Sequence, residues 1–261
     1  MPLIVTLALL LLTAFSPFRP DARGARQTMQ QTERLNEYIF EVGAFHKLRV
    51  LDNVNVVYRC VPDSAGFAAY RGEEDFRDAF IFTNNNGTLR VQVTTEDINK
   101  PGLPTIYLYS DYLTEAENSS LFTLKIENPA PCAEFKVRQE GNGTIIADGI
   151  NSTKVTAALA TGMGNVIVAG TCSNAELKMV GTGVIQADRL KAQSVKCLIV
   201  GSGSIGCWAE DKLSVKGIGS TKIYYKGNPE VKKTGGGKLF PVVGSTPDSA
   251  TGSDSPEEAE E

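Results

Sequence analysis

The sequence is poor in several residue types, and each scarcity removes a class of function. His46 is its single histidine, so a histidine-rich metal centre is excluded and a catalytic triad would have only one possible base. Helical periodicity is almost absent, which argues against a helical bundle. The net charge is −4, far from the strongly basic footprint of a nucleic-acid-binding protein. We therefore expect no metal or other cofactor and no nucleic-acid partner.

Cysteine is also sparse. Its five positions are Cys60, Cys132, Cys172, Cys197 and Cys207. An odd number cannot all pair within one chain, and five are too few for a disulfide scaffold. One bridge is compatible with the count, but buried free thiols are the favoured interpretation.

An apolar run opens the chain. Met1–Phe18 carries no charged side chain, and Leu3–Phe15 is almost wholly apolar. This run is too short to span a bilayer comfortably and is typical of the apolar region of a secretory signal peptide. We predict a signal peptide at 1–24, cleaved after Gly24, and a polar leader at 25–37; an uncleaved membrane anchor is the alternative. The protein is then exported to the periplasm, the outer-membrane surface or the medium.

The other end of the chain is acidic. Residues 242–261 contain six carboxylates and no lysine or arginine, so the rest of the chain sums to −4 + 6 = +2. Ser, Gly and Pro accompany these charges, a composition typical of disorder. We predict an acidic disordered tail at 242–261 and one domain at 38–241.

The first half of that domain shows strand signals. Leu89, Val91 and Val93 alternate with polar residues in a period of two, the pattern of a half-buried strand. A bend is expected at Asp52-Asn53 and one helical turn within 110–120. The predicted strands are 39–42, 48–58, 88–94, 106–109 and 122–126.

The second half is a repeat marked by glycine pairs. The pairs are Gly141 and Gly143, Gly162 and Gly164, Gly181 and Gly183, Gly201 and Gly203, and Gly217 and Gly219, at intervals of 21, 19, 20 and 16 residues. Such a period predicts a solenoid. We expect these glycines at corners, where stacked backbones approach closely and a positive φ is tolerated. Five coils at about 4.8 Å would form a stack of roughly 24 Å.

The residues after each pair predict the core. The second residue after each pair is Ile145, Val166, Ile185, Ile205 and Thr221; the fourth is Ala147, Val168, Ala187, Cys207 and Ile223. Nine of these ten are apolar, so they predict two inward columns, because alternate side chains of a strand share one face. A second strand in each coil points inward through Leu177 and Met179, Val195 and Cys197, and Leu213 and Val215.

Longer motifs resemble a known family. They are Phe40–Phe45, Asn53–Tyr58, Asn86–Val91, Gly217–Pro229 and Gly235–Gly237. Together with the glycine pairs they are similar to the head GIN domain, a family described as auto-transporter adhesins of bacterial envelopes whose function is unknown. The resemblance covers about Tyr38 to Pro241. It implies an all-β, right-handed parallel β-helix-like solenoid, an exported location and no catalytic residues.

Candidate catalytic groups are few. The glycine pairs precede strands rather than a helix, so they do not form a dinucleotide fingerprint. Asp148 and Asp188 share the fifth position after their pairs, two coils or about 9.6 Å apart, at the outer edge of the spacing of inverting glycosidases. Both also fit turn aspartates, and His46 fits a strand edge. Glu210 is the third carboxylate that an enzyme could use.

Candidate binding groups gather near the C-terminal end of the repeat. The lysines there are Lys212, Lys216, Lys222, Lys226, Lys232, Lys233 and Lys238. They could attract an anionic glycan or lipid headgroup, or they could form a solvated face that discourages aggregation. Strand alternation turns either Tyr224 or Tyr225 outward beside Lys222 and Lys226.

These observations leave three hypotheses. The leading one is a non-enzymatic envelope or secreted binding module, an adhesin that presents a solenoid face to a glycan or a surface protein. The alternatives are a polysaccharide lyase or hydrolase that uses Asp148, Asp188 or Glu210, and a purely structural envelope protein. Membrane contact is expected only through the signal peptide or association with the envelope.

Overall fold

The computed structural model describes residues 36–97 and 101–242, and in these ranges the chain is almost entirely β-strand. The predicted signal peptide, nearly all of the polar leader and all but the first residue of the acidic tail lie outside the described residues. Those assignments therefore stay predictions. Within the described ranges, no helix is long and apolar enough to cross a membrane.

The described ranges contain seventeen strands and two short 3₁₀ helices. The helices are η1 (Pro62–Ser64) and η2 (Glu74–Ala79). The strands are β1 (Asn36–Glu41), β2 (Lys47–Val50), β3 (Val56–Cys60), β4 (Phe67–Gly72), β5 (Phe80–Asn85), β6 (Thr88–Val93), β7 (Ile106–Ser110), β8 (Glu115–Asn118), β9 (Thr123–Glu127), β10 (Cys132–Glu140), β11 (Thr144–Thr161), β12 (Asn165–Gly181), β13 (Val184–Gly201), β14 (Ser204–Ile218), β15 (Lys222–Lys226), β16 (Glu230–Gly235) and β17 (Lys238–Pro241).

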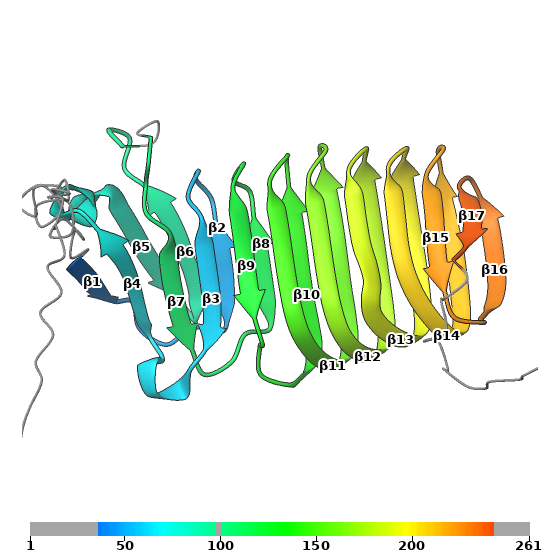
Figure 1. The fold of residues 1–261 in the computed structure, drawn as a ribbon, viewed down its shortest axis with the longest axis horizontal. Coiled ribbons are helices and arrows are strands. Elements are labelled where there is room, and N and C mark those ends of the chain that lie inside the picture. Colours follow the sequence, from blue (N-terminus) through cyan, green and yellow to red (C-terminus); the bar gives the residue numbers. More distant parts are fainter. Residues whose placement is uncertain (1–35, 98–100, 243–261) are drawn as a thin grey trace, which may run out of the picture. The chain divides into compact units, whose positions relative to one another are not determined.

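Most of the strands stack in parallel on two faces, and Figure 1 shows the coils side by side. Face A consists of β6, β2, β8, β10, the C-terminal halves of β11 to β14, and β16. Face B consists of β7, β3, β9, the N-terminal halves of β11 to β14, β15 and β17. The predicted all-β parallel solenoid is confirmed, with about six turns.

The inward columns form the core. Ile145, Val166, Ile185 and Ile205 occupy one register position on face B and are fully buried. On face A the corresponding inward residues are Leu177, Cys197 and Val215, also fully buried. The inward side chains of face A pack against those of face B. Neighbouring coils above and below close this core, so a single repeat could not bury these side chains alone.

Close approach of backbones explains the second glycine of each pair. A Cβ on Gly203 would overlap the carbonyl oxygen of Gly183, and a Cβ on Gly183 would overlap that of Gly164. The coils are joined at these turns by bonds such as Ser204 N–H to Gly183 O, 3.1 Å. Any side chain there would have to push neighbouring coils apart.

The predicted register of the fifth glycine pair is wrong by two residues. Gly217 pairs with Ile199 at the end of a strand, and the turn position aligned with Gly201 belongs to Gly219. Thr221 follows, buried, with its hydroxyl donating to Gly201 O at 3.1 Å. The interval is therefore 18 residues (219 − 201), and the column residue is Ile223 rather than Thr221.

The first coils do not stack in chain order. On face A, β2 lies between β6 and β8; on face B, β3 lies between β7 and β9. The coil of β2 and β3 is thus inserted between two coils that come later in the sequence (Figure 1). Leu113, in the connection from β7 to β8, is fully buried.

The polar segment 110–120 contains β8 and no helical turn, so the predicted turn is wrong. The segment follows the register of its neighbours: Ala116 pairs with Leu48 and Val137 in the inward column. Strands β4 and β5 were not predicted. Both pair in antiparallel fashion, β4 with β1 and β7, and β5 with β6.

Candidate binding surface

Strand alternation separates the two tyrosines of β15. Tyr225 pairs with Cys207 at an inward position and packs, partly buried, against the core. Tyr224 points outward from face B, 40% exposed. Only Tyr224 is therefore available to a ligand.

Tyr224 is paired with a second aromatic residue on the next strand. Phe240 of β17 is its register partner, and the two rings stack with centroids 5.3 Å apart and planes 23° from parallel. Phe240 is 38% exposed. On the other side, the register partner of Tyr224 is Gly206, and the Asp188 side chain lies beside it, 3.5 Å from where a Cβ on Gly206 would stand. The two rings thus form an uncovered platform on face B.

Two lysines border this platform. Lys222 and Lys238 are direct register partners on β15 and β17, both exposed on face B. Like charges placed opposite each other destabilise a sheet. Among the described residues, no carboxylate forms an ion pair with either lysine. An anionic ligand would relieve this repulsion. We call Tyr224, Phe240, Lys222 and Lys238 the aromatic–lysine platform.

Lys226, which the sequence places with these residues, is engaged elsewhere. Its Nζ lies 3.0 Å from Oδ2 of Asp188 and 3.3 Å from the Asp188 carbonyl oxygen. The contact crosses β14, since Trp208 is the strand neighbour of Lys226. Of Lys222, Lys226 and Lys238, it is therefore Lys226 whose charge a carboxylate neutralises.

Each of the three carboxylates proposed for catalysis has a structural partner. Asp148 caps its own turn through the Gly149 N–H at 3.0 Å. Asp188 binds Lys226, and Glu210 forms an ion pair with Lys191 at 2.9 Å. In residues 36–97 and 101–242, no hydrogen bond or ion pair links any two of these carboxylates, and no cluster of His, Cys, Asp or Glu is arranged for a metal ion.

The His46 ring packs against Tyr112 and the turn at Gly87. Its ring stacks on Tyr112, with centroids 5.6 Å apart and planes 10° from parallel. A Cβ on Gly87 would overlap the imidazole, and Gly87 has a φ of +75°. The ring thus covers the turn between β5 and β6.

The two inward cysteines lie in the core. Cys197 and Cys207 are fully buried, and all five cysteines of the chain are free thiols. A hydrogen bond with Cys207, together with burial, raises the pKa of Cys197 well above its usual value. Burial raises the pKa of Cys172 to about 11. Neither thiol is activated as a nucleophile, since the thiolate is the reactive form.

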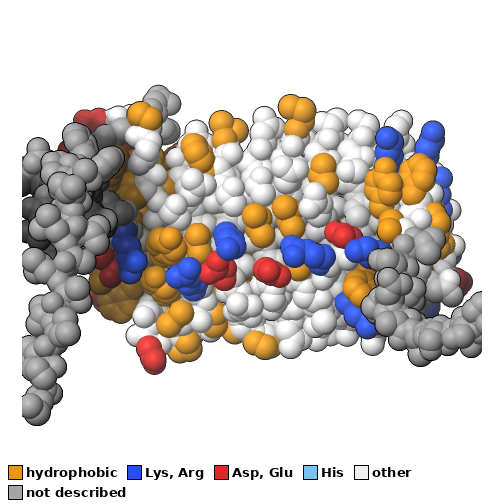
Figure 2. Space-filling model, viewed as in Figure 1, with side chains coloured by type: hydrophobic (Ala, Val, Ile, Leu, Met, Phe, Trp, Pro, Cys, Tyr) orange, Lys and Arg blue, Asp and Glu red, His pale blue; other side chains and the backbone are white. Residues whose placement is uncertain are grey.

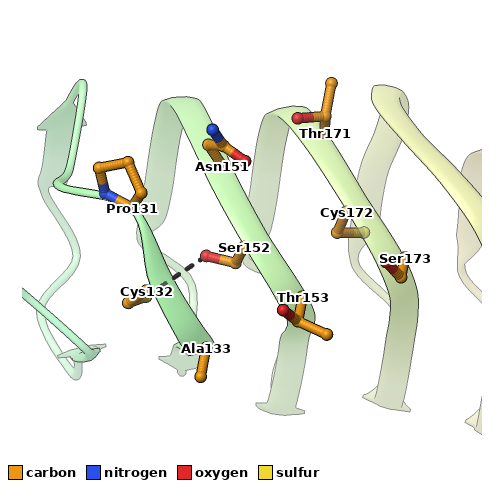
Figure 3. A pocket seen from close by; sticks show the side chains of 9 residues that line it. All are labelled: Pro131, Cys132, Ala133, Asn151, Ser152, Thr153, Thr171, Cys172 and Ser173. Carbon is orange, nitrogen blue, oxygen red and sulfur yellow. Dashed lines mark hydrogen bonds between the residues drawn. The ribbon is translucent and has the colours of Figure 1, made fainter.

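A shallow recess of about 620 Å³ lies where the long strands bend from face B to face A. Figure 3 shows its lining, in which the Cys132 thiol contacts the Ser152 hydroxyl at 3.3 Å. The lining is uncharged and consists of Pro131, Cys132, Ala133, Asn151, Ser152, Thr153, Thr171, Cys172 and Ser173. It has no aromatic platform and no cation.

A family model matches most of the chain. Residues 44–229 match the family described as "Putative auto-transporter adhesin, head GIN domain", and the chain is therefore a member of that family. No curated protein matches it in sequence.

Several solved structures share the fold. A "putative adhesin" from Bacteroides fragilis is 22% identical with a TM-score of 0.69, over 81% of this chain and 98% of that one. A "putative lipid binding protein" from Parabacteroides distasonis is 21% identical with a TM-score of 0.63 and the same coverage. A "putative adhesin" from Parabacteroides merdae is 17% identical with a TM-score of 0.59, over 80% and 96%. At these identities the likeness shows the fold.

Proposed function

We propose that this protein is a non-enzymatic, exported binding module of adhesin type, and that its aromatic–lysine platform binds an acidic glycan. One observation carries the proposal: two stacked, exposed rings, Tyr224 and Phe240, stand beside two lysines that no described carboxylate neutralises. Membership of an adhesin family supports a binding role at the cell envelope or outside the cell.

The chemistry of the platform fits a sugar. Aromatic faces combine a large apolar area with negative potential above the ring, and the C–H groups of a pyranose face match both properties. Lys222 and Lys238 add a requirement for negative charge. A uronic acid polymer satisfies both conditions, because each of its sugars carries one carboxylate. A neutral glycan satisfies only the first.

Calorimetric titration with polygalacturonate, and with neutral dextran as comparison, tests the proposal. We expect polygalacturonate to bind, with affinity that falls as salt rises, and dextran to bind weakly or not at all. Tyr224→Ala should weaken binding about tenfold, from the lost stacking and apolar contact. Tyr112→Ala, which removes an exposed ring outside the platform, is the matched control and should bind normally.

A glycan array would extend this test to other acidic and neutral sugars. Absence of binding to every glycan would refute the lectin-like function and leave a surface-protein partner or a purely structural role. Depolymerisation of a bound glycan, abolished by Asp188→Asn or Glu210→Gln, would instead establish the enzyme hypothesis.

A further inference from the structure

The turns at the glycine pairs, together with the preceding turn at 119–122, which contains no glycine, form a continuous edge of the solenoid between face A and face B. They comprise residues 119–122, 140–143, 161–164, 180–183, 200–203 and 218–221, and we call them the turn ridge. Consecutive turns are joined by backbone bonds, for example Thr182 N–H to Gly162 O and Ser202 N–H to Gly181 O, both 3.1 Å. At about 4.8 Å per coil, six turns extend roughly 24 Å.

Exposed apolar side chains are concentrated on this ridge. Val180, Val200 and Ile218 are successive register partners and form an unbroken outward column. The exposed fractions of the ridge's large apolar side chains range from 43% for Phe122 to 77% for Ile218. The full set is Leu121, Phe122, Met163, Val180, Val200 and Ile218. Figure 2 shows hydrophobic side chains along this upper edge.

The ridge is almost free of charge, and cations flank it. Glu140 is the one charged residue in the six turns, and Arg138 pairs with it at 2.7 Å. On face A, Lys178 and Lys216 stand two residues before Val180 and Ile218, and Lys178 also pairs with Glu176 at 3.2 Å. On face B, Lys222 and Lys238 occupy the first outward position after the turns of the last coils. Lysines of both faces thus border the C-terminal end of the apolar strip.

We propose that the turn ridge docks on a lipid bilayer that contains anionic lipids. Apolar side chains flanked by Lys and Arg are the arrangement by which peripheral proteins enter the boundary between headgroups and acyl chains, and each lysine near an anionic surface adds to the attraction. The backbone of the turns can enter this boundary at reduced cost, because N–H groups such as those of Thr182, Ser202 and Ser220 already bond to the preceding coil.

A membrane fits the ridge better than a protein partner does. The ridge is convex and only as wide as the separation of two sheets, about 10 Å. A folded partner would need a matching cleft to bury a useful area on so narrow an edge, whereas a fluid interface adapts to it. The proposal shares Lys222 and Lys238 with the acidic-glycan function, but its apolar contact comes from the ridge and not from the rings of Tyr224 and Phe240 on face B.

Quenching by brominated lipids locates the inserted residues. Trp208 is the only tryptophan and is half-buried on face B. A variant of the full chain with Val200→Trp and Trp208→Phe places the single indole on the ridge. With vesicles of phosphatidylcholine and phosphatidylglycerol, we expect strong quenching for this variant and little for the wild type. The readout is local, so the apolar segment Leu3–Phe15 cannot produce it.

Vesicle co-sedimentation provides the second test. Val200→Ser combined with Ile218→Ser should weaken binding about tenfold, while Ile39→Ser, an equally exposed apolar side chain away from the ridge, should not. Lys178→Gln with Lys216→Gln should reduce the preference for phosphatidylglycerol. Circular dichroism checks that each variant is folded. Tyr224→Ala should weaken glycan binding about tenfold and keep vesicle binding, which separates the two proposals.

Three results would overturn the proposal. The first is equal quenching of the ridge and face-B indoles, or quenching of neither, in vesicle-bound protein. The second is equal affinity for vesicles with and without phosphatidylglycerol. The third is concentration-dependent self-association in the absence of lipid that Val200→Ser with Ile218→Ser abolishes, which would identify the ridge as an interface between copies of the chain.

Discussion

Lys226 and Asp188 are 38 residues apart in sequence, yet the lysine Nζ lies 3.0 Å from the aspartate Oδ2 across the intervening strand β14. This contact joins a candidate ligand-binding cation to a candidate catalytic acid, and each satisfies the other. It also separates Lys226 from Lys222 and Lys238, which have no carboxylate partner among the described residues. The free positive charge of the platform therefore comes from two lysines and not from three.

Removing the aspartate should release the lysine. We expect Asp188→Asn to raise the affinity for polygalacturonate about two- to threefold, since one more cation near the platform becomes available. Both side chains are partly exposed, so the variant should lose at most about 1 kcal/mol of stability. Calorimetry and urea unfolding measure the two effects. Glu210→Gln, which releases Lys191 instead, is the control, and an equal gain there would contradict the assignment.

The spacing of the coils predicts a sharp difference between two glycines of the same turn and strand. Gly203→Ala should lower the free energy of unfolding by about 3 kcal/mol, because the added Cβ overlaps the Gly183 carbonyl oxygen and forces a shift of backbone. Gly206→Ala should change it by less than about 0.5 kcal/mol, since its Cβ would meet Asp188 at an ordinary 3.5 Å. Urea denaturation of both variants provides the comparison. Equal losses of unfolding free energy would mean that replacing any glycine, and not contact between coils, causes the destabilisation.

The solenoid could be predicted because its evidence is local. Alternation in each strand identifies Ile205 and Cys207 as inward residues, and glycine recurrence identifies the turns. The fifth register could not be predicted, because Gly217, Gly219 and Thr221 offer two choices and only pairing with Ile199 and Gly201 decides between them. The inserted coil of β2 and β3 depends on which strand edges meet, and no local pattern records that choice.

For the binding surface too, the residues within one strand could be predicted and the contacts between coils could not. Lys222 and Tyr224 lie on one outward face by simple alternation. Phe240 was missed, because it follows the last glycine cluster and belongs to no repeat, although its alternation with Leu239 would have placed it outward. The pairing of Lys226 with Asp188 joins two coils that are not adjacent, so periodicity alone does not reveal it.

The C-terminal edge of the stack carries residues that oppose further strand addition. In the described part of the chain, nothing pairs with the outer edge of β16 or β17. Lys233 takes the register position above Val215 in the inward column and is exposed at this end of the stack, and Pro241 stands on β17. An inward charge and an edge proline both discourage a strand from another molecule.

Replacing both residues should therefore convert the edge into a site of association. We expect Lys233→Val with Pro241→Val to form concentration-dependent oligomers, seen in sedimentation velocity and light scattering, relative to the wild type. Lys232→Val, on the outward side of the same strand, removes equal charge without opening the core column and should behave as the wild type. Oligomers formed equally by Lys232→Val would point to net charge as the cause.

Two buried tyrosines predict a loss of stability in alkali. Tyr58 and Tyr70 are fully buried; the Tyr58 hydroxyl contacts the Ser110 hydroxyl at 2.9 Å, and that of Tyr70 donates to Glu73 O at 3.1 Å. Burial raises the pKa of Tyr70 to about 12 and the pKa of Tyr58 well above its usual value. The native state therefore holds both phenols neutral, whereas the unfolded chain ionises them near pH 10.

Because these pKa values are raised in the folded state, the stabilisation is complete below about pH 10 and is lost as pH rises toward 12. For Tyr70 the loss approaches roughly 1.4 kcal/mol per pH unit across that window. Lysines also titrate there, so the measurement is the difference between wild type and Tyr70→Phe in urea unfolding at neutral pH and at about pH 11. We expect the stability of Tyr70→Phe to fall less steeply with pH. Identical slopes would mean that the Tyr70 phenol ionises at the same pH in the folded protein as in the unfolded chain.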